Sequence, residues 1–340
     1  MSKSGWIAYW KRGWLYLLLV VVFIMHIVVI TRPAEPMFDE KHYIPDARSI
    51  LEGGGTTRTE HPPLAKLIIA ASILVIGDNP YGWRLGSVVF GLSGIVFLYL
   101  ICRRLGLPEL ATFFSVFLFA FENLSFVQAS IAMLDVYSVT FMLAAFWVYL
   151  RNNYPVAAVL AGLSVLAKLT GITVLFVLVV HWLVSGRRYA WRFISSMFLT
   201  PVTVMVLLPV LDFVASGKFV DPIYSLHTMM DLSKSLTFES ATHPSLSRPW
   251  DWVLRPLLMP YWYDPHYTAA ISFTLWALII PGMGYMVFQA IRYRCNTALF
   301  CLAWFLGAYL LWIPFSLLSD RISFVYYFYP TVGAVCIALG

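Results

Sequence analysis

Two adjacent carboxylates, Asp39 and Glu40, follow the first long apolar run of the sequence. A carboxylate beside apolar groups can act as a general base when its pKa suits the task. At the end of an apolar run, such a base would lie at a membrane surface, where the headgroup of a lipid is found. The pair therefore indicates proton transfer on a membrane-borne substrate, with plain solvation of a loop as the alternative.

Basic side chains in the same part of the chain could bind a phosphate. Arg does so through a bidentate fork, and Lys does so as a point charge. The candidates that follow the acid pair are Lys41, Arg48, Lys66 and Arg84. Arg321, much later in the chain, is a further candidate, and pairing with its neighbour Asp320 is the alternative for it.

Further ionisable side chains could line the same site. Glu60 and His61 precede a Pro-Pro pair that fixes φ and removes two amide donors before a helix expected to begin near Leu64. Asp135 and Lys168 stand near the ends of apolar runs, where an ionisable residue is a functional hypothesis by default. These two residues either line the site or pair with each other to lock two helices together.

A second cluster combines imidazole, indole and guanidinium groups in a polar segment. Its members, which could close over an acceptor or stack on a sugar, are His243, Trp250, Trp252 and Arg255. Anchoring at the membrane interface is the alternative for the Trp residues. Glu60, His61 and His243 carry groups that suit Zn or Mn, but they offer no ligand pair at helical spacing. We therefore expect no cofactor, with a divalent metal as the open alternative.

The composition indicates what kind of protein must position these groups. Of the 340 residues, 60% are hydrophobic and 12% are charged, against roughly 45–50% and about 25% in a soluble domain. The chain is therefore predicted to be an all-α polytopic membrane protein. Its net charge of +6 does not indicate a nucleic-acid partner, because the basic residues stand at the ends of apolar runs rather than on one face.

Apolar runs of roughly 17–25 residues are read as candidate spans, and two of the ten found here are shorter. They fall near residues 14–30, 82–101, 109–127, 131–150, 155–168, 170–184, 194–212, 268–290, 298–316 and 323–340. Segments 31–81 and 213–267 are predicted to be large loops of a single membrane domain, 1–340, with no separate soluble domain. The last run reaches Gly340, and an eleventh span after it is compatible with the sequence.

The charges at the ends of the runs predict the orientation. With a cytoplasmic N-terminus, the inner loops hold one acid, Glu109, and these bases: Lys3, Lys11, Arg12, Arg103, Arg104, Arg151, Arg187, Arg188, Arg192, Arg292 and Arg294. Both large loops then face the outside of the plasma membrane, away from ATP and nucleotide sugars. A sugar donor used there would have to be carried by the membrane itself.

Six motifs resemble those of a known family and follow one another in the same order as in that family. The motifs are FDEKHYIPDA (38–47), EHPPLAK (60–66), NLSFVQASIAMLD (123–135), GLSVLAKLTG (162–171), HPSLSRPWDWVLRP (243–256) and RISFVYYFYP (321–330). Together they resemble the protein O-mannosyltransferases, polytopic glycosyltransferases of the GT-C class. Ala65 stands where the family often has Gly. The segment 213–267 is too short for the large outer module of eukaryotic members, so the chain resembles a bacterial or archaeal member.

The resemblance implies a GT-C fold with about 10–11 transmembrane helices and a large outer loop after the first helix. It implies a polyprenyl- or dolichyl-phosphate mannose donor and a Ser or Thr hydroxyl of a protein as acceptor. Inversion at the sugar by a single displacement would need one base, and Asp39 matches the family's catalytic Asp. Glu40 would position the acceptor or tune Asp39. Arg84 matches a family Arg placed for the donor phosphate, with Lys66 and Arg321 as further phosphate ligands.

Two other readings stay open at this point. One is a GT-C transferase that moves another lipid-linked sugar to a lipid or glycan, as aminoarabinose transferases do. The other is a transporter or lipid flippase, which would place charges along a path through the middle of the bundle. Here the charges gather at one face, which favours an enzyme. The sequence leaves a homodimer or a heterodimer open.

Overall fold

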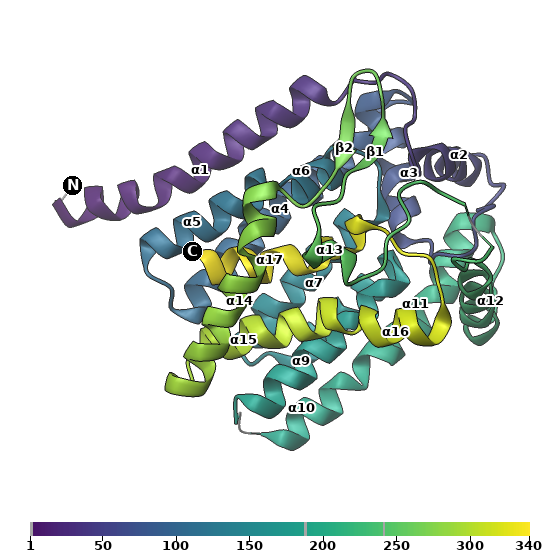
Figure 1. The fold of residues 1–340 in the computed structure, drawn as a ribbon. Coiled ribbons are helices and arrows are strands. Elements are labelled where there is room, and N and C mark those ends of the chain that lie inside the picture. Colours follow the sequence, from purple (N-terminus) through teal and green to yellow (C-terminus); the bar gives the residue numbers. More distant parts are fainter. Residues whose placement is uncertain (1–2, 187–188, 241) are drawn as a thin grey trace.

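The computed structural model describes residues 3–186, 189–240 and 242–340, and Figure 1 shows them as one helical bundle crowned by a small hairpin. Arg187 and Arg188 of the orientation argument lie outside the described residues, as do the side chains of Lys3, Lys11 and Arg12. The first half of the chain forms α1 (Lys3–Val29), α2 (Glu40–Leu51), α3 (Leu64–Ile76), α4 (Pro80–Leu105), α5 (Glu109–Phe121), α6 (Asn123–Ser130), α7 (Leu134–Leu150), α8 (Tyr154–Ala167), η1 (Leu169–Ile172) and α9 (Thr173–Val184).

The second half begins with α10 (Ala190–Met197), α11 (Leu199–Ser216), α12 (Pro222–Ser235) and α13 (Asp251–Leu254). The strands β1 (Met259–Trp262) and β2 (Tyr267–Ala269) pair antiparallel, with a register irregularity between Pro260 and Trp262. The chain ends with α14 (Phe273–Tyr293), α15 (Asn296–Phe305), the π-helical η2 (Leu306–Leu310), α16 (Trp312–Ser319), η3 (Val325–Phe328) and α17 (Tyr329–Leu339).

Helix α7 lies at the centre of the bundle. It is apolar on all sides and buried over most of its length, as expected of a helix that contacts neighbours all round. Helices α4 and α8 pack along it, while α17 packs against α5, α14 and α15. At Gly91, a Cβ atom would collide with Ala129, so glycine allows α4 to approach α6 closely.

Helices occur within all ten predicted spans, but their lengths differ from the prediction. Among the described residues, four helical segments are long and apolar enough to cross a membrane, namely 80–105, 190–216, 273–293 and 296–319. The pair α5–α6 makes a fifth if its 52° bend is counted within one span. The other apolar helices are shorter. The helical fold is thus confirmed, whereas the full number of spans stays a prediction.

The two predicted outer loops contain structure of their own. Segment 31–81 holds α2 and the apolar α3, which begins at Leu64 as expected. Segment 213–267 holds α12, α13 and β1, and Figure 1 shows α12 on the same side of the bundle as α2 and α3. This side of the molecule therefore carries both segments that the sequence marked as functional.

Candidate active site

Glu40 and Arg84 form a buried ion pair with complete hydrogen bonding. Asn79 caps α4 by accepting the N–H groups of Tyr81 and Gly82 at 3.0 and 3.3 Å, which places Arg84 in the first turns of that helix. The Arg84 guanidinium donates Nε to Glu40 Oε1 at 2.9 Å and Nη2 to Oε2 at 2.7 Å. Both side chains are fully buried. A bidentate pair of this kind is among the stronger charge-assisted contacts in proteins.

The remaining donors of Arg84 bind the backbone that follows α1. Nη1 donates to the carbonyls of Ile30 and Pro33, each at 2.7 Å, and Nη2 donates to that of Glu35 at 3.0 Å. Glu40 accepts in addition the N–H groups of Met37 at 3.0 Å and of Ala132 at 2.8 Å. A guanidinium has five N–H groups, and all five are used here. Arg84 therefore has none left for a phosphate, and the pair instead folds residues 30–40 onto α4.

A second buried ion pair joins α2 to α3. Lys66 Nζ lies 2.8 Å from Asp46 Oδ2, and both side chains are fully buried. Asp46 Oδ1 also accepts the N–H and the hydroxyl of Thr57 at 2.9 and 2.7 Å, and Lys66 donates to the Arg58 carbonyl. Burial raises the pKa of Asp46, but Lys66 and these hydrogen bonds outweigh it and leave that pKa below its usual value. Lys66 is thus held in place by the protein rather than presented to a ligand.

Asp39 differs from these neighbours because its carboxylate has no partner in the part of the chain that the structure describes. It occupies the N-cap position of α2, yet its side chain accepts no backbone N–H there, unlike most N-cap Asp residues. No hydrogen bond or ion pair of this carboxylate exists among the described residues. Burial raises the pKa of Asp39 to about 6, with Lys168 opposing the rise and Asp135 and Glu60 adding to it. A carboxylate in this condition is suited to act as a general base.

Aromatic rings form the walls beside Asp39. The preceding residue, Phe38, stacks on Tyr261 of β1 with ring centroids 4.2 Å apart and meets the edge of Tyr326 at 5.8 Å. Its φ of 45° is rare for a residue with a side chain. The hairpin and the segment before α17 therefore reach the start of α2. Sequence reasoning singled out none of these tyrosines, although RISFVYYFYP contains Tyr326 and Tyr327.

Asp135 and Lys168 are brought together. Lys168 Nζ lies 2.8 Å from both carboxylate oxygens of Asp135, and both side chains are almost fully buried. Lys168 has extended backbone between α8 and η1, so the break between two apolar helices places its ammonium in the site. Tyr326 and Tyr327 each hold a ring centroid 5.2 Å from that ammonium. The pairing alternative is thus present in the structure. The two charges act in opposite directions on the pKa of Asp39, which Lys168 lowers and Asp135 raises.

His61 enters the same region from the Pro-Pro turn. Its ring meets Tyr43 of α2 edge-on at 6.4 Å, and its buried Nδ1 has no partner among the described residues. Burial, assisted by the positive charges of Lys168, Lys66 and Arg321, holds the pKa of His61 well below its usual value. The imidazole is therefore neutral at physiological pH. Glu60, next to it, is partly exposed and has no charged partner among the described residues.

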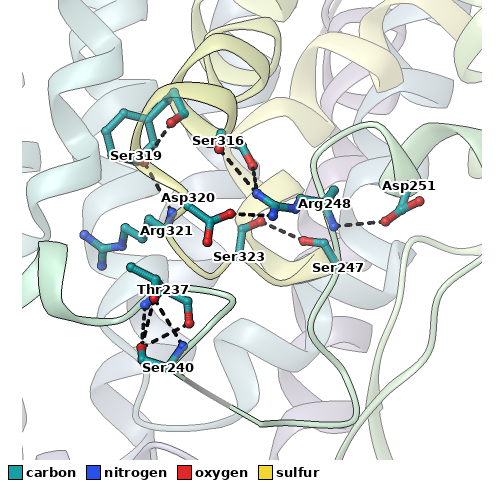
Figure 2. Close-up of polar contacts among 11 residues, drawn as sticks. Thr237, Ser240, Ser247, Arg248, Asp251, Ser316, Ser319, Asp320, Arg321 and Ser323 are labelled. Carbon is teal, nitrogen blue, oxygen red and sulfur yellow. Dashed lines mark hydrogen bonds and ion pairs between the residues drawn. The ribbon is translucent and has the colours of Figure 1, made fainter.

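The Arg321 guanidinium forms no ion pair among the described residues, because Arg248 pairs with the neighbouring Asp320. Figure 2 shows Asp320 paired with Arg248, whose Nη2 lies 2.5 Å from Asp320 Oδ1. Arg248 Nη1 also donates to the Ser316 hydroxyl and carbonyl at 3.1 and 3.3 Å. The Arg321 guanidinium points away from this pair, and its buried Nε has no partner among the described residues. The alternative in which Arg321 pairs with Asp320 is therefore absent from this structure.

The residues of the second cluster predicted from the sequence lie in different environments. Trp252 is fully buried, donates to the Ser247 hydroxyl at 3.1 Å and packs on Tyr309, so it belongs to the core. Arg255 pairs with Asp251 at 3.1 Å on the surface. Exposed His243 meets the edge of Phe324 at 5.5 Å. Trp250 lies beside Arg248, with the guanidinium 6.0 Å from its ring.

No metal centre is assembled from the predicted ligands. Among residues 3–186, 189–240 and 242–340, no three His, Cys, Asp or Glu side chains gather closely enough to hold a metal ion. Glu60, His61 and His243 therefore do not form a metal-binding group in this structure. The described site instead gathers an unpaired carboxylate, a neutral imidazole and an unpaired guanidinium.

Arg248 is the residue of this region that sequence reasoning missed. It stands inside the motif HPSLSRPWDWVLRP, which indicates a functional segment without distinguishing this position from its neighbours. Its partner Asp320 lies 72 residues further along the chain, and only tertiary structure brings the two together.

Comparisons with known proteins find similarity to protein mannosyltransferases. A family model described as dolichyl-phosphate-mannose-protein mannosyltransferase matches residues 60–214. The polyprenol-phosphate-mannose–protein mannosyltransferase of Corynebacterium glutamicum is 34% identical over 135 residues, which cover 36% of this chain and 26% of the relative. That of Mycobacterium tuberculosis is 32% identical over 148 residues, 42% of this chain and 28% of the relative. The matches thus span about a quarter of the length of these relatives.

Solved structures resemble nearly the whole chain. The S. cerevisiae protein O-mannosyltransferase Pmt1-Pmt2 complex bound to the sugar donor gives a TM-score of 0.72 at 12% identity, covering 96% of this chain and 84% of that one. ArnT from Cupriavidus metallidurans bound to undecaprenyl phosphate gives 0.70 at 18% identity, covering 96% and 59%. At these identities the likeness concerns the fold. The chain is therefore similar in sequence to protein mannosyltransferases over part of its length, and it has the fold of the Pmt1-Pmt2 and ArnT structures.

Proposed function

We propose that the protein transfers mannose from a polyprenyl-phosphate carrier to Ser or Thr hydroxyls of proteins, at the membrane face that carries α2 and β1–β2. The observation that carries the proposal is Asp39, an unpaired carboxylate with its pKa raised to about 6 among aromatic walls. The names of the actinobacterial relatives support the donor and the acceptor class. The orientation of this face toward the outside of the plasma membrane rests on the charge pattern of the loops.

The mechanism is a single displacement at the anomeric carbon. Asp39 takes the proton of the acceptor hydroxyl while the hydroxyl oxygen forms a bond to the anomeric carbon. The bond from the carbon to the phosphate oxygen breaks, the configuration inverts, and polyprenyl phosphate leaves with the electron pair. Positive groups that face the developing charge supply a large share of catalysis in such sites. Arg321 takes this role because its guanidinium has no ion pair among the described residues.

The other predicted residues receive different roles in this proposal. Glu40 and Arg84 are a structural pair that fixes the backbone leading into Asp39, and Lys66 with Asp46 fixes the far side of α2. Lys168 and Asp135 set the charge around Asp39, and Glu60 and His61 line the site from the Pro-Pro turn. His243 and Trp250 stand on the outer segment, where a protein acceptor would arrive.

Substitution of Asp39 tests the proposal directly. Asp39→Asn removes the base and keeps the side-chain volume, so we expect loss of transfer by about 100-fold or more, with unchanged thermal unfolding and donor binding. The measurement is transfer of labelled mannose from polyprenyl-phosphate mannose to a Ser/Thr-rich peptide by purified protein. Glu35→Gln, at an exposed acid of the same loop, is the matched control and should keep full activity. Near-normal transfer by Asp39→Asn would refute the assignment.

A second candidate function is transfer of a lipid-linked sugar to a lipid. The likeness of the fold to ArnT over 96% of the chain favours keeping it. Both reactions use a lipid phosphate leaving group, so they share the Asp39 and Arg321 roles. Parallel assays with a peptide acceptor and with lipid acceptors distinguish them, and product formed on lipid alone would select the second candidate.

A further inference from the structure

A cavity of about 430 Å³ lies at the end of the bundle opposite Asp39. Helix α4 carries Arg84 near its beginning and Arg104 near its end, and α7 likewise runs from Asp135 to Leu150. The cavity is lined by Arg104, Leu150, Asn152, Tyr154, Tyr189, Arg192 and Asn296. Its volume is within the range of roughly 300–1,000 Å³ that is typical of ligand pockets. The proposed reaction uses none of these residues.

The polar lining of the cavity is positive. Among the described residues, the lining includes two guanidinium groups and no carboxylate. Arg104 donates Nε to the Leu150 carbonyl at 3.0 Å, which fixes the fork, and neither of its Nη groups has a partner among the described residues. Arg192 lies over the Tyr189 ring at 5.7 Å, and its side chain forms no hydrogen bond or ion pair in the described part of the chain. Two forks without carboxylate partners favour an anion with several oxygens, such as a phosphate.

The position of the cavity favours a phosphate that belongs to a lipid. Helix α10, which supplies Arg192, buries Phe193 and Ser196 and exposes Trp191 and Ile194. An exposed Trp beside a basic residue on a short amphipathic helix is typical of the membrane interface. The same end of the bundle is the one where the sequence places its excess of bases. Anionic headgroups attract such basic groups, and each Lys or Arg near the surface contributes about 1 kcal/mol of binding free energy.

We propose that this cavity binds the phosphate of an anionic phospholipid headgroup, held between Arg104 of α4 and Arg192 of α10. The phosphate lies against Tyr154 and Tyr189, and Asn296 offers an amide donor from the start of α15. The lipid thereby joins α4, α10 and α15 at the end of the bundle remote from the reaction. A freely diffusing phosphate has the same binding chemistry, and the experiment distinguishes the two sources.

The test uses the purified full chain in a neutral detergent and phosphatidylglycerol as the probe. Retained lipid is counted by native mass spectrometry, and the unfolding temperature is followed during titration. We expect saturable binding of phosphatidylglycerol with a rise in the unfolding temperature. Phosphatidylcholine and inorganic phosphate at millimolar concentration should produce neither effect. Equal binding of phosphatidylcholine, or displacement of the lipid by millimolar inorganic phosphate, would overturn the proposal.

Matched variants locate the binding. Arg104→Gln combined with Arg192→Gln should weaken phosphatidylglycerol binding roughly tenfold or more, as expected for the loss of two basic groups near the headgroup. The control, Arg103→Gln with Arg151→Gln, removes the same charge from the same end but outside the cavity, and should bind as the unaltered protein does. Arg192→Gln alone removes no described protein hydrogen bond, so it gives a folded variant if the double one fails to fold. Equal loss in the cavity and control doubles, or an unchanged affinity in Arg192→Gln, would refute the site.

Discussion

Adjacent residues of the same charge have different tasks at the start of α2. Glu40 accepts four hydrogen bonds, two of them from Arg84, so its negative charge is fully compensated in the buried interior. Asp39 has no such partner, and burial therefore raises its pKa to about 6. A compensated carboxylate is a weak base, whereas an uncompensated one is ready to accept a proton. The proposed division between a structural and a reactive carboxylate follows from hydrogen bonding rather than from residue type.

The pH dependence of transfer should report Asp39. Because the base must be ionised, we expect kcat/KM to fall as the pH decreases through about 6. Glu60 contributes a negative charge that raises the pKa of Asp39. In Glu60→Gln that charge is absent, ionisation of Asp39 becomes easier, and the acid limb should move to lower pH.

The measurement is the full pH profile of kcat/KM for each variant. The control is Glu52→Gln. Glu52 is an exposed acid directly after α2 and is not among the groups that shift the pKa of Asp39, so this variant should leave the profile unchanged. An acid limb that stays fixed in Glu60→Gln, or one that moves to higher pH, would contradict the assignment of Asp39 as the titrating base.

At the scale of elements, backbone contacts join residues 236, 237 and 247 to residues 321–323, which precede α17. Thr237 and Arg321 form a β-bridge, Ile322 N–H donates to the Leu236 carbonyl at 3.1 Å, and Ser247 N–H donates to the Ser323 carbonyl at 3.0 Å. Figure 2 shows that Arg248, which follows Ser247, also forms an ion pair with Asp320. The ion pair engages the carboxylate of Asp320, the sequence neighbour of Arg321, so we expect the Arg321 charge to remain available for a phosphate.

This arrangement predicts a rescue. In Arg248→Ala, Asp320 is released and can pair with Arg321, so we expect kcat/KM for the lipid donor to fall about tenfold or more. Adding Asp320→Asn removes the competing carboxylate and should restore most of the activity. Thermal unfolding is measured alongside, because loss of the Arg248 contacts with Ser316 lowers stability in both variants. If the double variant stays as impaired as the single one, Arg248 serves the fold alone.

The sequence predicted the elements well and the partners of its charges poorly. Long apolar runs located the helices, and the break at Lys168 was visible as the boundary between two short runs. By contrast, Arg84 is expected at a phosphate because it follows the acid pair and matches a family Arg placed for the donor phosphate. Its actual partners, Glu40 and the carbonyls of residues 30–35, depend on how the loop folds back over α4. Long-range pairs such as Arg248 with Asp320 have no local sequence signal.

At the scale of the whole molecule, the scarce charges are sorted between the two ends of the bundle. Buried pairs and the unpaired Asp39 lie at the end with α2, while Arg104 and Arg192 line the cavity at the other. Taking charges out of water is costly unless they are paired, so the paired set marks the folded interior of the site. The unpaired basic set is what orients a polytopic protein.

The orientation can be tested with a cysteine that the protein already has. Cys295 is exposed in the turn between α14 and α15, while Cys102, Cys301 and Cys336 are buried. Because Arg292 and Arg294 flank this turn, we expect it on the cytoplasmic side. A membrane-impermeant maleimide added to intact spheroplasts should therefore leave Cys295 unlabelled, and permeabilisation should allow labelling that Cys295→Ser abolishes.

An introduced cysteine gives the opposite readout for the other end. Glu239 is exposed in the segment before α13, on the side of the proposed reaction. In Cys295→Ser with Glu239→Cys, the same reagent should label intact spheroplasts without permeabilisation. If instead Cys295 reacts in intact spheroplasts and the introduced cysteine does not, the site faces the cytoplasm. Nucleotide sugars would then be within reach of the site, and the physical reason for a membrane-carried donor would disappear.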